Sequence, residues 1–553
     1  MSDQPSRPPA PRDQLFPALT PAQVDRIAAR GRTRRVMRGE ILFEAGSQDF
    51  PFFVVASGKV RIVRPSPQGD TEVVVHEPGQ FTGEVAMLSG RRTLVEARVT
   101  EPGEVIELDR EQFLDLVHTD SELGAIIMRA FILRRIELVH RGLGDVIVIG
   151  SEHAQGTLRI REFLTRNGHP FQSIDLEHDT GVEQLLHDFN VRPQDVPVVI
   201  CRCQLVLRNP DNAEIAECLG FNTAIDEAQL RDVVIVGAGP AGLAAAVYGA
   251  SEGLDVLVIE ANAPGGQAGM SSNIENYLGF PTGISGQNLA GRAYDQVQKF
   301  GAQVLIAKRA VKLDCERIPY VIEIDDGSRV RARTVIVASG AEYRRLPVTN
   351  MSRFDGAGVY YGATPMEAQL CNGGDVIVVG GGNSAGQAAV FLAEKARHVD
   401  MMVRGPGLAD TMSRYLIQRI EAHPAITVRT GCEITAVEGG DHLERVEWRE
   451  GKKTGAADVR HVFVMTGAVP STAWLDGCVA LDGKGFVKTG PALSPEEIAG
   501  SRWPHHRAPH LLETSLPGVF AVGDVRATNV KRVASAVGEG SIAIAFVHEV
   551  LRG

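Results

Sequence analysis

The stretch VVIVGAGPAGLAAAVY, residues 233–248, decides the fold. Four apolar residues lead into Gly237-x-Gly239-x-x-Gly242, and an alanine-rich segment follows, so the sequence predicts a buried strand, a tight turn and a helix. The first glycine makes the turn, the second lets a pyrophosphate approach the backbone, and the third lets helix and strand pack closely. Glu260 ends the next apolar run, where a carboxylate accepts hydrogen bonds from a ribose hydroxyl.

A second copy of this pattern follows at residues 376–392, VIVVGGGNSAGQAAVFL, with the motif Gly380-x-Gly382-x-x-Ala385. Its next strand has the sequence HVDMMVRG, so Arg404 occupies the region that corresponds to Glu260. An arginine there binds a ribose 2′-phosphate that a carboxylate would repel, and Arg414 is a candidate second contact. Two dinucleotide-binding units are therefore expected, one inserted in the other, and the second should prefer NADPH to NADH.

Composition excludes several classes of protein. The chain has 553 residues, with 57 basic and 68 acidic side chains and a net charge of −11, which argues against nucleic-acid binding. No apolar run approaches the length of a membrane span, and the Pro-rich start, residues 1–13, is expected to be a disordered tail rather than a signal peptide. Seven cysteines without any C-x-x-C argue against a secreted disulfide framework and against a zinc site, so no metal is expected. A cytoplasmic location follows.

Two smaller modules precede the glycine motifs. Glycines punctuate short apolar strands in residues 16–120, a pattern typical of a β-roll, and residues 110–140 follow with helical periodicity. Residues 145–150, 171–176 and 196–201 are predicted strands, and residues 158–167 and 182–189 are predicted helices, which together indicate a small α/β domain.

Residues 231–553 resemble the low-molecular-weight thioredoxin reductases. The matching segments are GGQ (265–267), ENYLGFPTGISG (275–286), VASGA (337–341), GGGNSA (380–385) and GVFAVGDV (518–525), in family order with KRVASAVGEG (531–540) after them. The resemblance implies FAD in the first unit and NADPH in the second, with hydride passing from nicotinamide C4 to flavin N5. It assigns FAD to Gly237, Gly239, Pro240, Ala241, Gly242, Glu260, Gly266, Gln267, Asn276, Gly340, Gly523, Asp524, Lys531, Arg532 and Val533. It assigns NADPH to Gly380, Gly382, Asn383, Ser384, Ala385, Arg404 and Arg414.

The chain departs from this family at the redox dithiol. The family has C-A-T-C just before the second glycine motif, whereas this chain has Gly362, Ala363, Thr364 and Pro365. Without thiolates no relay from flavin to disulfide can run there. Cys371, the nearest cysteine, is expected to be a buried apolar residue. Cys201-Arg202-Cys203 is the closest cysteine pair in the chain and is an alternative dithiol.

Residues 16–140 resemble cyclic-nucleotide-binding domains through FTGEVAML and SGRRTLVEA, residues 81–97. The resemblance assigns Glu84 to the ribose hydroxyl, Arg92 to the cyclic phosphate and Gly83 to an amide nest, while Thr93 leaves cAMP and cGMP both open. A roll retained only for dimerisation or domain contact is the alternative. Residues 143–225 resemble a thioredoxin or glutaredoxin fold without its dithiol, with a cis proline expected in Asp195-Val196-Pro197 and His153 expected to be a loop residue.

The sequence thus predicts a multidomain α/β protein of five parts. They are the tail (1–13), the β-roll with helices (14–141), the thioredoxin-like domain (142–226), the FAD domain (227–347 and 462–553) and the NAD(P)H domain (348–461). We expect a homodimeric FAD-dependent NAD(P)H oxidoreductase that a cyclic nucleotide could regulate, with an electron acceptor that the sequence does not specify. A disulfide reductase using Cys201 and Cys203, and a non-catalytic flavin sensor, remain alternatives. An insertion at residues 494–511, with Trp503, His505, His506 and His510, is expected to be a lid, an interface or a surface loop.

Overall fold

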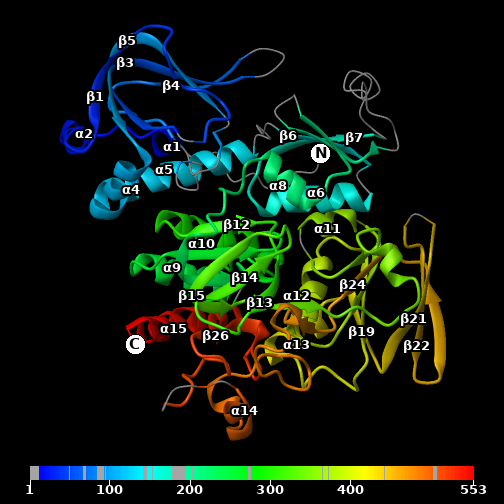
Figure 1. Cartoon of the computed structure of the whole chain (residues 1–553). Helices are drawn as coiled ribbons and strands as arrows, with labels where there is room; N and C mark the ends of the chain where they lie inside the picture. The colour runs from blue at the N-terminus through cyan, green and yellow to red at the C-terminus, as the bar shows by residue number, and fades with distance from the viewer. Residues whose placement is uncertain are drawn as a thin grey trace. The chain divides into compact units, whose positions relative to one another are not determined.

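The computed structural model describes residues 11–552, apart from positions 49, 66–69, 84–86, 88–91, 94, 141–145, 152–153, 177–194, 202–204, 272–273, 275, 364, 372, 441, 502 and 504–506. The chain divides into two compact units. The first comprises residues 1–151, 160–225 and 295–308, and the second comprises residues 152–159, 226–294 and 309–553. Figure 1 labels the elements along the chain.

The β-roll is an antiparallel sheet in the order β1-β5-β3-β4, with β2 against β5. Its long strands β3 and β5 pair over most of their length, as Figure 1 shows. The sheet is built around an aromatic core in which the rings of Phe52 and Phe113 lie 4.8 Å apart. The strands are β1 (Arg32–Val36), β2 (Ile41–Phe43), β3 (Phe52–Arg64), β4 (Thr71–His76) and β5 (Glu96–Leu108). The β-roll that the sequence predicts is confirmed. It encloses the cavity described below as a candidate ligand site.

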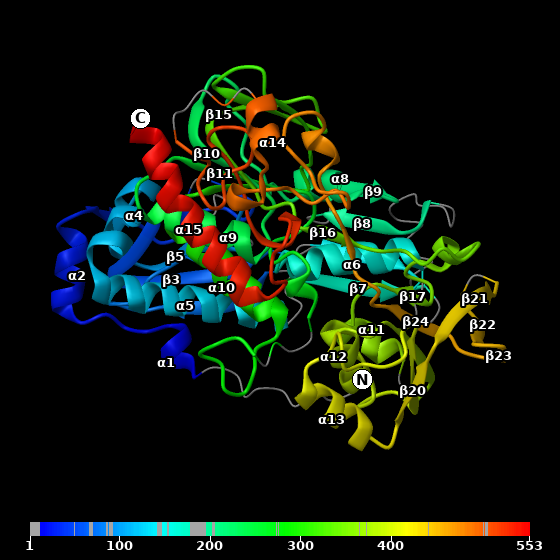
Figure 2. The same ribbon diagram turned by 90° about the horizontal axis from the view of Figure 1, so that it is seen from below.

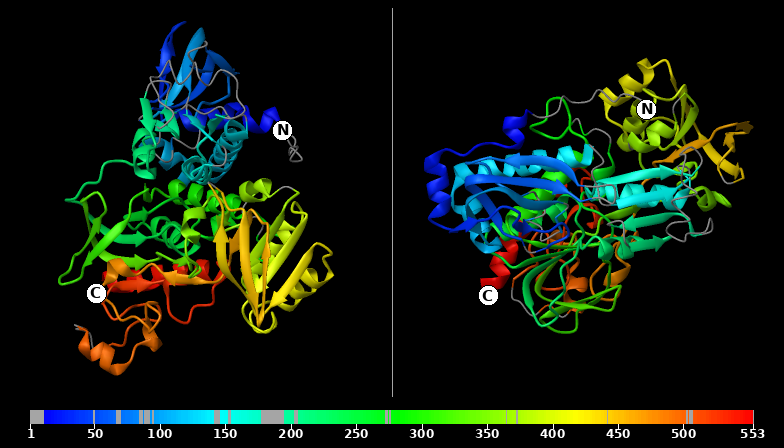
Figure 3. Two further views of the ribbon diagram at one scale, coloured as in Figure 1. Left: turned by 90° about the vertical axis from the view of Figure 1, so that its right-hand side faces the viewer. Right: turned by 90° about the horizontal axis from the view of Figure 1, so that it is seen from above.

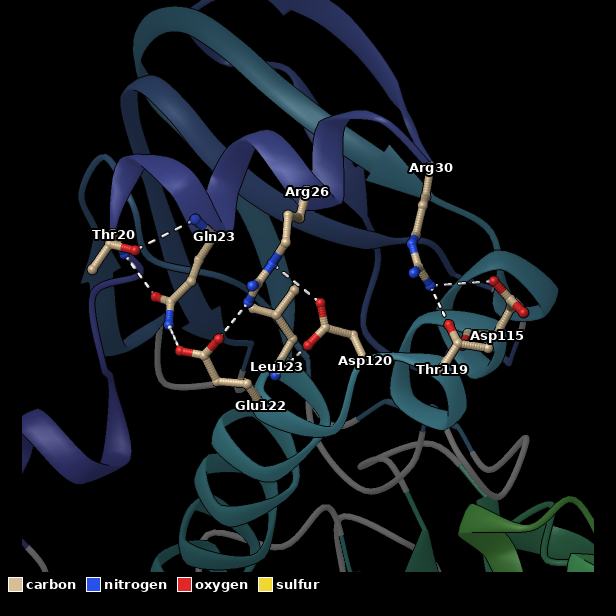
Figure 4. Close-up of polar contacts among 9 residues, drawn as sticks. All are labelled: Thr20, Gln23, Arg26, Arg30, Asp115, Thr119, Asp120, Glu122 and Leu123. Carbon is tan, nitrogen blue, oxygen red and sulfur yellow. Dashed lines mark hydrogen bonds and ion pairs between the residues drawn. The ribbon is translucent and has the colours of Figure 1, made fainter.

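The helices of the roll that lie in its described residues are α1 (Arg12–Leu15), α2 (Pro21–Ala28), α4 (Arg110–Thr119) and α5 (Ser121–His140). Because α1 begins at Arg12, the last residues of the predicted tail are helical, and residues 1–10 lie outside the described part of the chain. Polar contacts join α2 to α5 (Figure 4): Gln23 Nε2 donates to Glu122 Oε1 at 2.8 Å, and Arg26 pairs with Glu122 at 2.7 Å. The Arg26–Glu122 ion pair is exposed, so it contributes little to the free energy of folding.

The small α/β segment forms a sheet in the order β7-β6-β8-β9, in which β7 is parallel to β6 and the other neighbours are antiparallel. Its elements are β6 (Val146–Gly150), α6 (Gln155–Arg166), β7 (Phe171–Asp175), β8 (Val198–Cys201), β9 (Leu205–Arg208) and α8 (Asn212–Cys218). The Val196–Pro197 peptide bond is cis, as expected. The predicted helix at 182–189 lies outside the described residues, and the sequence did not predict β9 or α8.

The first dinucleotide unit contains a sheet with the strand order β11-β10-β15-β14-β13, and β26 lies beside β15. Strands β10, β11, β15 and β26 are parallel neighbours, while β13 and β14 form an antiparallel extension. The strands are β10 (Leu230–Val236), β11 (Val256–Glu260), β13 (Ala310–Asp314), β14 (Tyr320–Ile324), β15 (Arg329–Val337) and β26 (Val519–Ala521); α10 (Gly286–Lys299) and β12 (Gln303–Ile306) also occur in this stretch. The parallel strands end together at the edge where the glycine loops begin.

Helices α9 (Pro240–Ser251) and α15 (Val533–Arg552) lie against each other, as Figure 2 shows. Their close approach requires Gly540, because a Cβ at that position would run into the carbonyl oxygen of Ala241. By length and composition α15 is the one described helix that could cross a membrane. Its residues Ala543, Ile544 and Val547 are instead fully buried in the unit.

The second dinucleotide unit is a parallel sheet in the order β17-β24-β18-β19-β20. Its strands are β17 (Val359–Tyr360), β18 (Asp375–Val379), β19 (His398–Val403), β20 (Ile426–Thr430) and β24 (His461–Val464), and its helices are α11 (Pro365–Leu370), α12 (Asn383–Leu392) and α13 (Arg414–Ala422). Because β24 belongs to this sheet, the unit extends through residue 464 rather than ending at 461. An antiparallel sheet of β21 (Cys432–Glu438), β22 (Arg445–Glu450) and β23 (Lys453–Ala457) is drawn in yellow to orange in Figure 3.

Short elements join and extend these units. Strands β16 (Ala341–Tyr343) and β25 (Ala468–Pro470) pair where the chain enters and leaves the inserted unit. The 3-10 helices are η2 (Ala268–Met270), η3 (Met351–Phe354), η4 (Ala473–Leu475), η5 (Gly490–Ala492) and η6 (Gly523–Val525), and α14 (Pro495–Gly500) lies in the predicted insertion.

Candidate functional site

Two glycine loops face each other at the carboxyl end of β10. Gly239 caps the start of α9, and Gly266 adopts φ +52° in the loop after β11. A Cβ on Gly266 would lie 3.0 Å from the Cα of Gly239, so only hydrogen atoms separate the loops. Gly237, with φ +106°, and Gly242 have no room for a Cβ either, which keeps the turn and the helix close to the sheet. The loops form the bare-backbone cradle that an elongated pyrophosphate requires.

Glu260 holds the first glycine loop in shape. Its buried carboxylate accepts the backbone N–H of Ala238 at 2.7 Å, of Asn262 at 2.9 Å and of Ala263 at 3.1 Å. The carboxylate therefore lies beside the cradle, at the end of β11, where the motif places it. The loop contacts add an organising role that the spacing of residues alone did not indicate.

Asp524 follows β26 at the same edge of the sheet. Burial raises the pKa of this carboxyl, an effect that Lys531 opposes and Glu539 reinforces. The physical cause is desolvation, because burial disfavours the charged form of a carboxyl group. The structure thus provides a partly buried acceptor, which suits hydrogen bonds from a polyol or ribose.

Glu539 is a site residue that the sequence reasoning missed. Its carboxylate accepts the N–H of Gly523 at 2.7 Å and the side-chain amide of Asn529 at 2.7 Å, and it pairs with Arg526. These contacts fix the turn that carries Asp524. A charged residue inside the apolar segment after Val533 was the available signal.

The remaining predicted flavin residues are not all together. The side-chain amide of Gln267 donates to the carbonyl of Ala341, beside Gly340, so these segments meet. Lys531 lies over the ring of Phe486 at 4.5 Å. Asn276 lies on an exposed turn, and the structure gives it no contact with the others. The further predicted residues continue these segments: Pro240 and Ala241 in α9, exposed Arg532, and Val533 at the start of α15.

The segment that replaces the family dithiol lies beside Met270, the last residue of η2. A Cβ on Gly362 would lie 3.6 Å from the methyl carbon of Met270. Ala363 is buried, Thr364 lies outside the described residues, and Pro365 begins α11. Burial raises the pKa of the nearby Cys371 thiol to about 12, so it stays protonated and unreactive at neutral pH.

The second glycine loop is held by two hydrogen bonds. Thr411 Oγ1 donates to the carbonyl of Gly381 at 2.7 Å, and Asn383 Oδ1 accepts the N–H of Ser413 at 2.8 Å. Gly380, with φ +143°, makes the turn, and Gly382 caps α12. Asn383 and Ser384 open that helix, and Ala385 is buried within it. Thr411 was not predicted from the sequence.

Arg404 directly follows β19 and Arg414 begins α13, so both lie beyond the carboxyl ends of the strands. Both side chains are exposed, and neither forms an ion pair within the described part of the chain. Two uncompensated guanidinium groups at this edge suit a phosphate monoester.

The β-roll encloses a cavity of about 100 Å³. Of the residues assigned to a cyclic nucleotide, Gly83 and Thr93 line the cavity, Arg92 is not among its lining residues, and Glu84 lies outside the described residues. Arg92 Nε is buried without a hydrogen-bond partner in the described chain. The cavity is mostly apolar, with lining residues Leu15, Phe16, Phe43, Phe50, Ile62, Val73, Val74, His76, Gly83, Thr93, Val95, Arg134 and Glu137.

Arg134 and His76 give this cavity its polar character, and the sequence did not single out either. Arg134 on α5 donates to the carbonyl of Gly83 at 2.8 Å, of Phe81 at 3.2 Å and of Leu15 at 2.8 Å. It therefore ties the helix to the backbone at Phe81 and Gly83. Burial lowers the pKa of His76 well below its usual value, and the charge of Arg134 adds to this effect.

The cysteine pairing corrects one expectation, the alternative dithiol of Cys201 and Cys203. Cys201 is bonded to Cys218, with a Cα–Cα distance of 6.9 Å, rather than to Cys203, which lies outside the described residues. Cys315 and Cys478, 163 residues apart, form a second disulfide with a Cα–Cα distance of 5.9 Å. Sequence spacing did not reveal these pairs because the fold brings distant segments together.

The insertion is anchored to its own unit. The Trp503 indole N–H donates to the carbonyl of Arg507 at 2.8 Å, and Arg507 pairs with the fully buried Glu513 at 2.7 Å. The ring of His510 stacks on Phe546 of α15 at 4.7 Å. His505 and His506, and also His153 of the thioredoxin-like segment, lie outside the described residues. Within the described ranges no cluster of side chains could hold a metal ion.

Comparison with known proteins identifies the architecture. Residues 231–540, more than half of the chain, match the family model of pyridine nucleotide-disulphide oxidoreductases, and residues 33–120 match that of the cyclic nucleotide-binding domain. The chain is 33% identical over 318 residues to the thioredoxin reductase of Mycolicibacterium smegmatis, a match that covers 57% of this chain and 94% of that protein. It is 31% identical over 315 residues to an NADH dehydrogenase of Bacillus subtilis, covering 56% of this chain and 57% of that protein.

Among solved structures, the thioredoxin reductase of T. acidophilum aligns with a TM-score of 0.52 and 27% identity, covering 59% of this chain and 99% of that one. Family members use flavin and nicotinamide cofactors, which the two glycine cradles fit. The chain therefore belongs to the pyridine nucleotide-disulphide oxidoreductase family, as a thioredoxin-reductase-like member with a cyclic nucleotide-binding domain ahead of it.

Proposed function

We propose that this protein is an FAD-dependent NADPH oxidoreductase. We further propose that its flavin passes electrons to an acceptor other than a C-x-x-C dithiol within the same chain. One observation carries this proposal. The segment that bears the dithiol in the thioredoxin reductases is Gly362-Ala363-Thr364-Pro365 here, and the chain contains no C-x-x-C. Because exchange with a disulfide substrate requires thiolates, the usual relay has no starting group.

The facing loops at Gly239 and Gly266 support FAD as the first cofactor. Bound flavin would accept a hydride from reduced nicotinamide and pass the electrons on. The chain's own contribution is to bind and orient. The loop amides would hold the pyrophosphate, Glu260 and Asp524 would accept hydroxyl hydrogens, and Gln267 would position the loop beside the ring system.

The exposed guanidinium groups of Arg404 and Arg414 support NADPH rather than NADH as the electron donor. Each could meet a 2′-phosphate without first breaking an ion pair with the described chain. Such a charge-assisted contact is stronger than a neutral hydrogen bond, so it separates the two coenzymes by affinity. Phosphate recognition at this edge is the basis of the coenzyme preference.

We further propose that a cyclic nucleotide regulates this activity through the roll. The cavity at Gly83 and Thr93 supports ligand binding, and the contact of Arg134 with the Gly83 carbonyl supports a link from the ligand loop to helix α5. A ligand can shift activity only if it binds two states of the protein differently. Isothermal titration with cAMP and with cGMP tests this proposal. We expect heat with one of them, and the absence of heat with either would contradict it.

The acceptor is tested by steady-state oxidation of NADPH by the full chain with oxygen, a quinone and an aromatic disulfide reagent. The proposal predicts turnover with oxygen or quinone that survives alkylation of accessible thiols. Turnover with the disulfide reagent alone, abolished by alkylation, would contradict it.

A further inference from the structure

The disulfide between Cys315 and Cys478 has no part in the sites described above. Cys315 directly follows β13, the outer strand of the antiparallel extension, and Cys478 follows η4. Their Cα atoms lie 5.9 Å apart, within the range of protein disulfides. The bond joins two segments that flank the whole inserted dinucleotide unit, because 163 residues separate the cysteines.

This pair is accessible, in contrast to the free thiols of the described chain. Cys315 and Cys478 are both partly exposed, whereas Cys371 and Cys432 are each 1% exposed. Burial also raises the pKa of Cys371 to about 12 and of Cys432 to about 11, which keeps both protonated. In the other disulfide, Cys201 is 1% exposed, whereas its partner Cys218 is partly exposed. An external thiolate can therefore reach the Cys315–Cys478 bond while the protein stays folded.

The surroundings also suit the reduced form of the pair. The Sγ atom of Cys478 lies 3.3 Å from the carbonyl oxygen of Leu313, so an acceptor for its S–H is already in place.

A short segment with hydrogen bonds at both ends leads from Cys478 to the backbone at Ser339 and Gly340. The N–H of Cys478 donates to the carbonyl of Leu475 at 2.9 Å. At the other end of the segment, Ser471 donates its N–H to Gly340 at 3.1 Å and accepts from the Ser339 hydroxyl at 2.8 Å. Gly340 precedes Ala341, the residue that Gln267 contacts.

We propose that Cys315–Cys478 is a reversible exchange site for an external dithiol, and that its opening alters the flavin environment through the segment at Ser471. One thiolate of the reductant attacks a sulfur of the pair and forms a mixed disulfide, releasing the other cysteine as a thiolate. The second thiol of the reductant then closes its own disulfide. Two electrons and two protons pass to the cysteines, and the dithiol is oxidised.

The first experiment measures exchange on the folded, flavin-loaded full chain. The protein is equilibrated with dithiothreitol and its oxidised form at a series of ratios, then alkylated and mapped by peptide mass. We expect Cys315 and Cys478 to become alkylated together while Cys371 and Cys432 stay unmodified. A pair that reacts only after denaturation, or that is already alkylated without reductant, would overturn the proposal.

The second experiment follows flavin fluorescence across the same series, and this readout rests on the proposed FAD site whereas alkylation does not. We expect the fluorescence to change with the same midpoint as alkylation, and the Cys315→Ser/Cys478→Ser double variant to match reduced wild type without reductant. Cys371→Ser, as the matched control, should retain the midpoint. Complete exchange with unchanged fluorescence would overturn the link to the flavin, and a chain that exchanges but holds no flavin would contradict the proposed function instead.

Discussion

A Cβ on Gly266 would lie 3.0 Å from the Cα of Gly239, although the two glycines belong to loops that follow different strands. This proximity defines the first cradle, since a side chain on Gly266 would enter the space between the loops, whereas a Cβ on Gly239 would lie 3.9 Å from the Cα of Gly266, in ordinary contact. Gly266 additionally adopts φ +52°, a conformation that L-residues rarely take. Because of this close approach, a single added methyl group at Gly266 should weaken flavin binding.

Gly266→Ala should lower the amount of bound flavin sharply, because the methyl group enters the space between the loops. The matched control is Gly253→Ala, which carries the same kind of backbone strain at φ +87° but meets no atom within 4 Å. Both variants should lose about 1–2 kcal/mol of stability from strain. The ratio of flavin to protein absorbance measures the difference, and equal flavin content in the two variants would refute the cradle.

Asp524→Asn should stabilise the flavin-free protein at neutral pH while weakening flavin retention. Burial raises the pKa of this carboxyl in the folded state, so the wild type loses stability as the pH rises from about 4 through that raised value. The amide has no charge to desolvate, and its advantage should vanish in acid. Thermal melting of the apoprotein at several pH values tests the predicted gain in stability. The rate of flavin dissociation at neutral pH tests the predicted loss of flavin retention.

His76→Phe should make the roll less sensitive to acid. Because the folded-state pKa of His76 is depressed, its stability contribution is present above the ordinary value of about 6.5 and is lost as the pH falls below it. A phenyl ring keeps the edge contact with Phe16 without taking up a proton. Hydrogen exchange of β3 and β5 on either side of that value is the measurement, with His118→Phe, an exposed position, as control.

Arg404→Ala should raise the KM for NADPH about tenfold or more and leave the KM for NADH nearly unchanged, since only NADPH carries the 2′-phosphate. Arg397→Ala is the matched control. This arginine is also exposed, but it pairs with Asp375 at the opposite, amino end of the strands. Equal effects of the two substitutions on both coenzymes would remove Arg404 from the phosphate site.

Local periodicity and glycine spacing allowed most of the architecture to be predicted. The strand, turn and helix around Gly237 and around Gly380 lie within a few residues of their expected bounds, because each motif is a continuous stretch with its own steric logic. The long strands of the roll followed from the same kind of local pattern.

Features that join distant segments could not be predicted in this way. The Cys315–Cys478 bond depends on the fold bringing β13 to the segment after η4, and spacing carries no trace of it. Arg134 was missed because its role depends on which face of α5 meets the Gly83 carbonyl. Glu539 likewise acts on a turn that lies far away until the helix docks.

The most direct test of the account is an anaerobic titration of the flavin-loaded chain with NADPH, followed by flavin absorbance. A flavin that does not pass electrons to a dithiol of its own chain takes up one hydride equivalent. About one NADPH per flavin should therefore complete the loss of flavin absorbance. A relay of the thioredoxin-reductase kind would also reduce a disulfide. An endpoint at about two NADPH per flavin would therefore contradict the claim that electrons leave this flavin without a cysteine pair.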